Sequence, residues 1–248
     1  MLSFWAKTSG TWINVALVLL GTGCGLLLRN QLSPKMRVII TQAMGLTTIF
    51  IGLSMAQDLS KAKAGGVEGV ILALIALALG GLLGEWWQIE HRMNTLGNWL
   101  KSRFKGGSRF TEGFVAASLL FCVGPMTILG SLNNGLLGDG TILVVKSTMD
   151  GLVSIALAGT YGMGVGFSIL PIIFYQGGLS LLASGLGQII PDPTTAPSIL
   201  LVTGTGGIML LGLGINLIEI GKIHVASFLP ALAIAPLISW ISRNITAM

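Results

Sequence analysis

Residues 122–139 read CVGPMTILGSLNNGLLGD, an apolar run that Gly124 and Pro125 interrupt and that ends near two adjacent asparagines, Asn133 and Asn134. Proline lacks an N–H group and clashes with the preceding turn, so Pro125 predicts a kink or a break in a helix. In a bilayer, the backbone groups freed by a break must be satisfied by protein or by a water-filled cavity. The stretch therefore indicates either a kinked span followed by an Asn-Gly turn, or a discontinuous helix whose open end faces a solute or ion.

The rest of the chain has the composition of a membrane protein. Of its 248 residues, 52% are apolar and 9% are charged, whereas soluble domains carry about 25% charged residues. The basic residues behind the net charge of +5 are spread over short connections, which argues against a nucleic-acid interface. We expect residues 1–248 to form a single integral membrane domain that is embedded in the lipid bilayer.

Apolar segments of about 20 residues are long enough to cross a bilayer as helices. The sequence contains eight of them, at residues 11–29, 37–57, 67–86, 112–131, 141–163, 166–187, 197–219 and 224–243. This pattern predicts an all-α fold, a polytopic transmembrane helical bundle of about eight spans. Seven spans remain the alternative if one segment is re-entrant.

The longest connection, residues 87–111, reads WQIEHRMNTLGNWLKSRFKGGSRFT. Its apolar residues recur at helical spacing, from Ile89 and Met93 to Leu96, Leu100 and Phe104, with basic residues elsewhere. This pattern favours an amphipathic helix lying on the cytoplasmic leaflet. A regulatory docking helix is the functional alternative for the same segment.

Two ionisable residues lie inside the fifth apolar segment. Lys146 and Asp150 are four residues apart, and Ser154 follows after four more, so all three share one helix face. At 1.5 Å per residue, Asp150 lies about 14 Å into the span, where a charge is costly and usually faces a cavity or a partner. The pair is either a self-neutralising structural ion pair or part of a site for a solute or proton.

The stretch of residues 162–185, which overlaps the sixth segment, repeats the pattern of a weakened apolar run. Pro171, Gly177 and Gly178 loosen it, while Tyr175 and Gln176 offer polar groups at depth. Interrupted spans on both sides of a charged one are typical of transporter binding sites. The candidate substrate or ion site therefore comprises Asn133, Asn134, Lys146, Asp150, Tyr175 and Gln176.

A weak internal similarity relates the second and seventh segments, FIGLSMA at residues 50–56 and LLGLGIN at residues 210–216. The third and eighth segments are also loosely similar, at residues 71–79 and 229–237. Elements five spans apart cross the membrane in opposite directions, so such a repeat is inverted, as in many secondary transporters.

The motifs of common enzymes are missing from the sequence, which has no HExxH, no P-loop and no Ser/His/Asp set at matching depths. We therefore expect neither an enzyme nor a metal or cofactor protein. A secondary transporter or channel-like protein for a small solute or ion is the favoured function, as a monomer or a homo-oligomer. A membrane scaffold or sensor that acts through residues 87–111 is the alternative.

Four stretches resemble the YqgA/YdfK-type family of bacterial integral membrane proteins, whose function is unknown. They are FCVGPMTILGSLNNGLLGD, KSTMDGLVSIALA, GVGFSILPIIFYQGGLSLLA and LLGLGINLIEI. The resemblance extends over nearly the whole chain and implies a multi-pass protein of the bacterial plasma membrane. In this family an acidic residue commonly occupies the second position after Gly-Ser-Leu. This chain has Asn134 there.

The distribution of Lys and Arg predicts the orientation of the chain, because cytoplasmic loops are enriched in these residues. One set of alternate connections holds nine Lys and Arg residues and the other holds four. The set of nine includes residues 87–111, so we expect this segment in the cytoplasm and both termini outside. Reporter fusions at the C-terminus and near Lys101 measure this directly, and a cytoplasmic C-terminus would contradict the eight-span topology.

Overall fold

The computed structural model of the chain describes residues 3–186 and 197–246. The elements in chain order are α1 (Phe4–Arg29), α2 (Pro34–Ala56), η1 (Gln57–Ser60), β1 (Lys63–Ala64), β2 (Val67–Glu68), α3 (Gly69–Trp86), α4 (Ile89–Arg103), α5 (Phe110–Cys122), α6 (Pro125–Leu137), α7 (Thr141–Tyr161), η2 (Met163–Ser168), α8 (Ile169–Ile172), the π-helical η3 (Ile173–Gly177), α9 (Gly178–Leu186), α10 (Pro197–Leu217), η4 (Val225–Phe228) and α11 (Ala231–Thr246). The predicted all-α fold class is confirmed.

Among the described residues, seven helical segments are long and apolar enough to cross a membrane. The pair α5 and α6 also passes this test, but it bends by 61° at the break between its two helices. The boundaries follow the predicted apolar segments closely, as for α7, which covers Thr141–Tyr161 where residues 141–163 were predicted. The largest difference is at α1, which begins at Phe4 rather than at residue 11, since Ser3 caps it.

The internal contacts of the chain divide it into two compact units. The first unit contains Met1–Ala43 and Asn94–Ile190, and the second contains Met44–Met93 and Pro191–Met248. The first unit therefore holds α1, α5, α6, α7 and the segment from η2 to α9. This unit also contains the charged residues of the candidate site.

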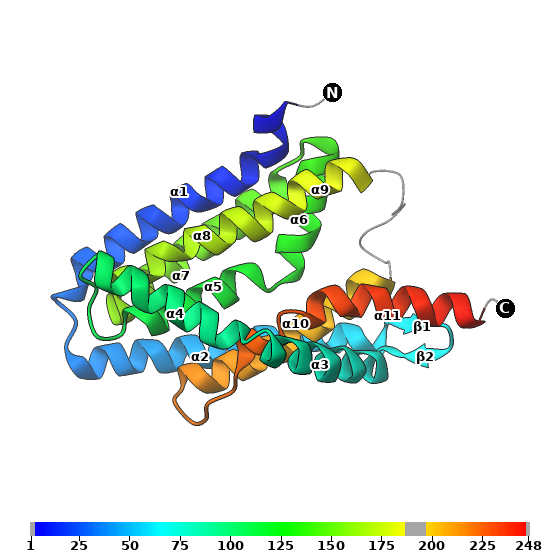
Figure 1. Cartoon of the computed structure of the whole chain (residues 1–248). Coiled ribbons are helices and arrows are strands. Elements are labelled where there is room, and N and C mark those ends of the chain that lie inside the picture. The colour runs from blue at the N-terminus through cyan, green and yellow to red at the C-terminus, as the bar shows by residue number, and fades with distance from the viewer. Residues whose placement is uncertain (1–2, 187–196, 247–248) are drawn as a thin grey trace. The chain divides into compact units, whose positions relative to one another are not determined.

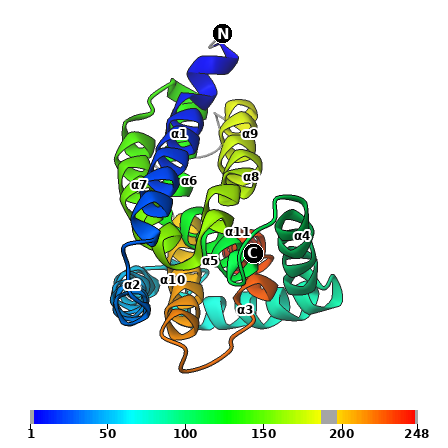
Figure 2. The ribbon, with the colours of Figure 1, turned by 90° about the vertical axis from the view of Figure 1, so that its left-hand side faces the viewer.

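Helices α1 and α7 lie side by side and run in the same direction (Figures 1 and 2). Near the start of both helices Gly10 contacts Leu143, and near their ends Gly25 contacts Ala158. Midway, a Cβ atom on Gly21 would collide with the backbone carbonyl of Gly151. Small residues allow this close approach of two backbones, which is how membrane helices gain packing energy without a hydrophobic effect between them.

The bent pair α5–α6 crosses the whole length of this unit. Helix α5 begins beside the C-terminal end of α7, where Gly113 contacts Tyr161. Helix α6 ends beside the N-terminal ends of α7 and α1, where Gly130 contacts Leu143 and Asn134 accepts a hydrogen bond from Gly10 N. The pair is therefore a broken span that crosses once, rather than a re-entrant loop that returns to the side on which it began.

The parallel course of α1 and α7 leads to the same conclusion. With α2, α3 and α5–α6 each crossing once between them, α7 is the fifth span and runs in the direction of α1. A re-entrant α5–α6 would make α7 the fourth span and reverse it. The described part of the chain thus contains seven helical segments able to cross a membrane, or eight if the bent pair α5–α6 counts as one span.

In the second unit, α10 packs antiparallel to α2, and α11 packs antiparallel to α3. Gly52 contacts Gly207 and Gly45 contacts Gly214, so two glycines seven residues apart on each helix bring the backbones of α2 and α10 together. On α3, the backbone at Gly84 lies against Ser227. The two-residue strands β1 and β2 pair antiparallel just before α3.

Helix α4, Ile89–Arg103, forms within the predicted amphipathic connection, residues 87–111. Part of this connection packs against other helices. Leu100 is buried in a cluster with Phe110 and Phe114, and the ring of Phe104 lies 4.7 Å from that of Phe167. Leu96, also on the predicted apolar face, is exposed. Only part of the predicted apolar face of α4 is thus buried within the protein.

Two glycines on α1 provide a matched test of the α1–α7 contact. Gly21 faces the backbone of Gly151, whereas a Cβ atom on Gly23 would meet nothing within 4 Å. We expect Gly21→Ala to lower the free energy of unfolding by about 1–3 kcal/mol, because the helices must separate to admit the methyl group. Gly23→Ala should leave it unchanged or raise it slightly. Thermal unfolding in detergent measures both, and equal melting temperatures would contradict this packing.

Candidate functional site

The predicted ion pair forms in the middle of α7. Lys146 Nζ donates a hydrogen bond to Asp150 Oδ2, and both side chains are buried. Asp150 is the tenth of the 21 residues of α7, which places it near the centre of the span. Ser154, on the same face, donates to the backbone carbonyl of Asp150 at 2.7 Å and so does not contact the carboxylate.

Asn14, a residue that sequence reasoning did not select, connects this pair to two other spans. Its Nδ2 donates to Asp150 Oδ2 and to Gln176 Oε1, at 3.0 Å each. Gln176 Nε2 in turn lies 3.4 Å from Thr11 Oγ1, its acceptor on α1. A network of five polar side chains therefore joins α1, α7 and η3, and consists of Lys146, Asp150, Asn14, Gln176 and Thr11.

The orientation of the Asn14 amide is fixed by its two acceptors. A rotated amide would place its oxygen against the carboxylate of Asp150, which is repulsive. In the orientation observed, Asn14 Oδ1 is buried and has no hydrogen-bond partner among the described residues. An unsatisfied buried acceptor costs about 1–3 kcal/mol, and in a native structure it calls for an explanation such as a ligand.

A signal for Asn14 was present in the sequence. Thr8, Thr11 and Asn14 recur every three residues in the otherwise apolar first span, and all three are buried. Polar side chains at such positions of a membrane helix usually face a neighbouring helix or a cavity. We missed this pattern because the first span contains no charged residue near its centre.

Asn134 is placed differently from the residues around Asp150. Its Oδ1 accepts from Gly10 N at 3.0 Å, and its Nδ2 donates to Ala6 O at 2.9 Å and to Ser9 Oγ at 3.1 Å. These three bonds tie the end of α6 to the first turns of α1, away from the Lys146–Asp150 pair. Asn133 beside it is half-buried.

The predicted helix breaks lie on both sides of the ion pair in the chain. At the first, α5 ends at Cys122, Gly124 has an extended backbone and α6 begins at Pro125. Thr127 Oγ1 donates to Phe121 O at 3.2 Å, which satisfies a carbonyl group freed by the end of α5. The broken backbone is thereby compensated within the protein, as a lipid environment demands.

At the second predicted break the helix is not interrupted, because Met163–Ala183 is one continuous helical segment, and the irregularity in it is a π-helical turn. Pro171 lies within the short α8, Gly177 ends η3, and Gly178 begins α9. Gln176 is in the π turn and fully buried, while the neighbouring Tyr175 is half-buried. Single π turns inside helices occur frequently at functional sites, because they shift the side chains that follow by one position.

Few other titratable groups lie near the ion pair. Cys122, at the end of α5, is buried and close enough to interact electrostatically with both Lys146 and Asp150, and Tyr175 interacts with Cys122 in the same way. The described residues contain no cluster of three His, Cys, Asp or Glu side chains that could hold a metal ion. The oxygen atoms around Asp150 thus come from one carboxylate and from uncharged amides and hydroxyls.

Asp139, between α6 and α7, has a structural role outside this network. Its Oδ1 accepts hydrogen bonds from Thr141 Oγ1 at 2.6 Å and from Thr141 N at 2.9 Å. These bonds favour the charged form and lower the pKa of the Asp139 carboxyl. The side chain thereby stabilises the first turn of α7, which carries the ion pair.

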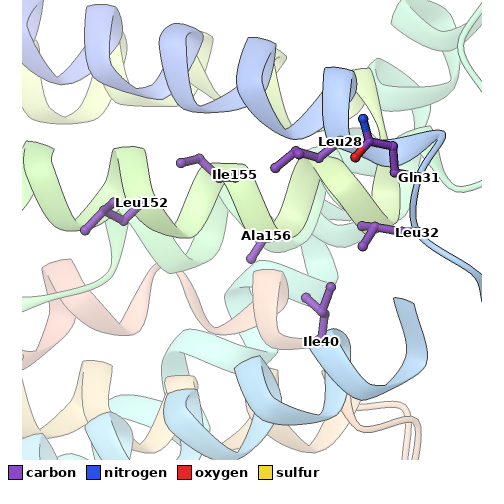
Figure 3. Close-up of a pocket in the computed structure, with 7 residues that line it drawn as sticks. All are labelled: Leu28, Gln31, Leu32, Ile40, Leu152, Ile155 and Ala156. Atoms are coloured by element: carbon purple, nitrogen blue, oxygen red, sulfur yellow. The ribbon is translucent and has the colours of Figure 1, made fainter. Parts of the chain in front are cut away.

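A surface pocket of the first unit lies apart from the ion pair (Figure 3). Its lining is apolar except for the Gln31 amide, and consists of Leu28, Gln31, Leu32, Ile40, Leu152, Ile155 and Ala156. Leu152 and Ile155 are residues of α7, but they do not belong to the polar network around Asp150. An apolar hollow on a membrane helix suits lipid chains, so we do not place the candidate solute there.

Comparison with known proteins shows relatives of the same length. Residues 9–240 match the family model described as "Protein of unknown function (DUF554)". The chain is 32% identical over 233 residues to the uncharacterized membrane protein YdfK of Bacillus subtilis, a match that covers 94% of this chain and 96% of YdfK. It is 30% identical over 233 residues to the uncharacterized protein YqgA of Escherichia coli, covering 91% and 94% of the two chains. No solved structure matches the chain.

The resemblance that the motifs of the sequence indicated is therefore confirmed over most of the chain, and the named relative YdfK is itself described as a membrane protein. The chain belongs to the DUF554 family of proteins of unknown function.

Proposed function

We propose that this chain is a secondary transporter or channel-like protein for a small solute or ion in the bacterial plasma membrane. The observation that carries the proposal is the network at the centre of the first unit, where a buried ion pair adjoins an amide oxygen without a partner. Ionisable groups at such depth are costly and usually mark a pathway for ions, protons or solutes. The site requires no cofactor and consists of Asp150, Lys146, Asn14 and Gln176.

The broken span α5–α6 and the π turn in the span Met163–Ala183 support this function. Helix α7 with the ion pair packs against α6, which follows the break, and Gln176 reaches the network from the π turn. Discontinuous helices at a midplane site are a recurring device of secondary transporters, because the interruptions expose backbone and polar groups to the solute. A purely structural ion pair has no need of a broken span and a π turn near it.

A constant separation in the chain supports the inverted repeat that is common in such transporters. Asn14 and Gln176, which bond to each other, are 162 residues apart. The same separation relates Gly45 to Gly207, Gly52 to Gly214, and the first residue of α3, Gly69, to the first residue of α11, Ala231. This separation is two residues longer than the one that relates residues 50–56 to 210–216. It is four residues longer than the one that relates residues 71–79 to 229–237.

The sequence follows the same separation. Residues 14–25 (NVALVLLGTGCG) and 176–187 (QGGLSLLASGLG) are identical at five of twelve positions. In the structure, α1 runs antiparallel to the segment from η2 to α9, since Thr22 contacts Gly166 whereas Thr11 lies near Gly177. Spans one to three and six to eight are then the two halves of the repeat, with opposite directions as inversion requires.

Removing both charges of the ion pair tests the proposed site. Lys146→Met or Asp150→Asn alone leaves one buried charge without a partner, which typically costs about 3–5 kcal/mol. The double variant leaves none, so we expect it to fold with near wild-type thermal stability in detergent. If the carboxylate binds the solute, the same variant should lose flux in proteoliposomes tested with sodium, potassium, ammonium and amino acids.

The exposed pair Asp58 and Lys61 is a matched control, since Asp58→Asn with Lys61→Met removes the same two charges from the second unit. This control should retain both stability and flux. Full flux in a well-folded Lys146→Met, Asp150→Asn variant would show that the buried pair is structural and would overturn the proposed site.

A further inference from the structure

We propose that Lys146 is a built-in competitor for a small monovalent cation, and that a cation binding at Asp150 releases one proton from Lys146. The inference rests on the proposed function and specifies the ligand class of the same site. It stands on three features of the described residues, namely the position of the Lys146 ammonium, the oxygen atoms around it and the charge balance of the site.

The Lys146 ammonium occupies the place that a cationic ligand would take. Lys146 Nζ and Asn14 Nδ2 both bind the same carboxylate oxygen, Asp150 Oδ2. Because Lys146 is on the same helix as Asp150, one turn away, its long flexible side chain can withdraw without movement of the backbone. Ligand and ammonium then compete for a single carboxylate.

The oxygen atoms next to this carboxylate suit a small hard cation. Asn14 Oδ1 is buried and has no hydrogen-bond partner among the described residues, and Gln176 Oε1 accepts a hydrogen bond from the Asn14 Nδ2 that also bonds Asp150. Carboxylate and amide oxygens are ligands of hard cations, whereas softer metals prefer imidazole and thiolate. A cation at Asp150 would also satisfy Asn14 Oδ1, which the ion pair leaves without a partner.

The number of charges favours a cation of charge +1. Asp150 is the only buried carboxylate in the described residues of the first unit, because Glu112 and Asp139 lie at exposed positions. The ion pair is neutral as it stands. Adding a monovalent cation while Lys146 keeps its proton leaves an excess positive charge in a buried site, and such charges are strongly disfavoured.

Loss of one proton restores neutrality. The carboxylate with the lysine ammonium, plus the cation, gives the carboxylate with the bound cation, an uncharged lysine amine and one released proton. Lysine readily becomes neutral when it is buried without a partner. If the protein carries the cation across the membrane, the exchange of one cation for one proton moves no net charge.

Two other titratable groups lie near the pair, Cys122 on α5 and Tyr175 on η3. Neither a thiol nor a phenol carries a positive charge that a bound cation could replace. On α1 the titratable residues Lys7, Cys24 and Arg29 lie more than a turn from Asn14 toward the two ends, and α6 has none. Among the described residues, Lys146 is the one charged donor in contact with the carboxylate.

The experiment measures proton release by the purified protein in weakly buffered detergent solution. A pH indicator follows the addition of sodium or potassium chloride, with N-methyl-D-glucamine chloride at equal ionic strength as the blank, and calorimetry measures binding of the same salts. We expect close to one proton released per cation bound. By linkage, the apparent affinity should rise about tenfold per pH unit while Lys146 is protonated.

Three variants identify the source of the proton. Lys146→Met should bind the cation with no proton release and with an affinity that no longer depends on pH, and Asp150→Asn should bind none. Ser147→Ala removes a buried hydroxyl that bonds to Leu143 O beside the pair, and should behave as the wild type. Should Lys146→Met fail to fold, the pH dependence of the wild-type affinity still decides.

Cation binding without proton release, release that survives in Lys146→Met, or no binding of either sodium or potassium would each overturn the inference. The last result, together with Asp150-dependent flux of another solute in proteoliposomes, would leave the proposed transport function standing. Conversely, proton-coupled binding without any flux would support the cation site and contradict transport.

Discussion

The negative charge of Asp150 lies in the middle of a membrane-spanning helix, so the protein itself must supply the groups that stabilise it. Lys146 balances the charge, and Asn14 provides the second hydrogen bond to the same oxygen. These contacts require α1 to approach α7 closely, because the Asn14 side chain is short. The glycines at positions 21, 25 and 151 make that approach sterically possible, so the packing of the first unit and the chemistry of its centre depend on each other.

The break between α5 and α6 and the π turn at η3 can both be understood from the same requirement. A broken backbone in a membrane must satisfy its free polar groups internally, and here Thr127 does so for Phe121 at the α5–α6 break. At η3 the π turn places the Gln176 amide against Asn14. Each irregularity therefore has compensating contacts within the first unit, which is what distinguishes an organised irregularity from a weak point of the fold.

Much of the fold was predictable because apolar length and proline act locally along the chain. The spans, the break at Pro125 and the Lys146–Asp150 pair all follow from such local signals. The partner of the pair did not, because Asn14 meets Asp150 only through the tertiary contact of α1 with α7. For the same reason Asn134 looked like a site residue, although its three hydrogen bonds fasten α6 to α1.

The proposed inverted repeat gives the Asn14–Gln176 contact a further meaning. If the two residues are equivalent positions of two inverted halves, an exchange of conformation between the halves exchanges their roles. In the state described, Asn14 bonds Asp150 directly and Gln176 stands behind it. In the exchanged state Gln176 would bond Asp150, and its extra methylene together with the π turn would supply the additional reach. The Asp150 carboxylate is on α7, outside both halves of the repeat. It would then accept a hydrogen bond from each half in turn, as alternating access to one fixed site requires.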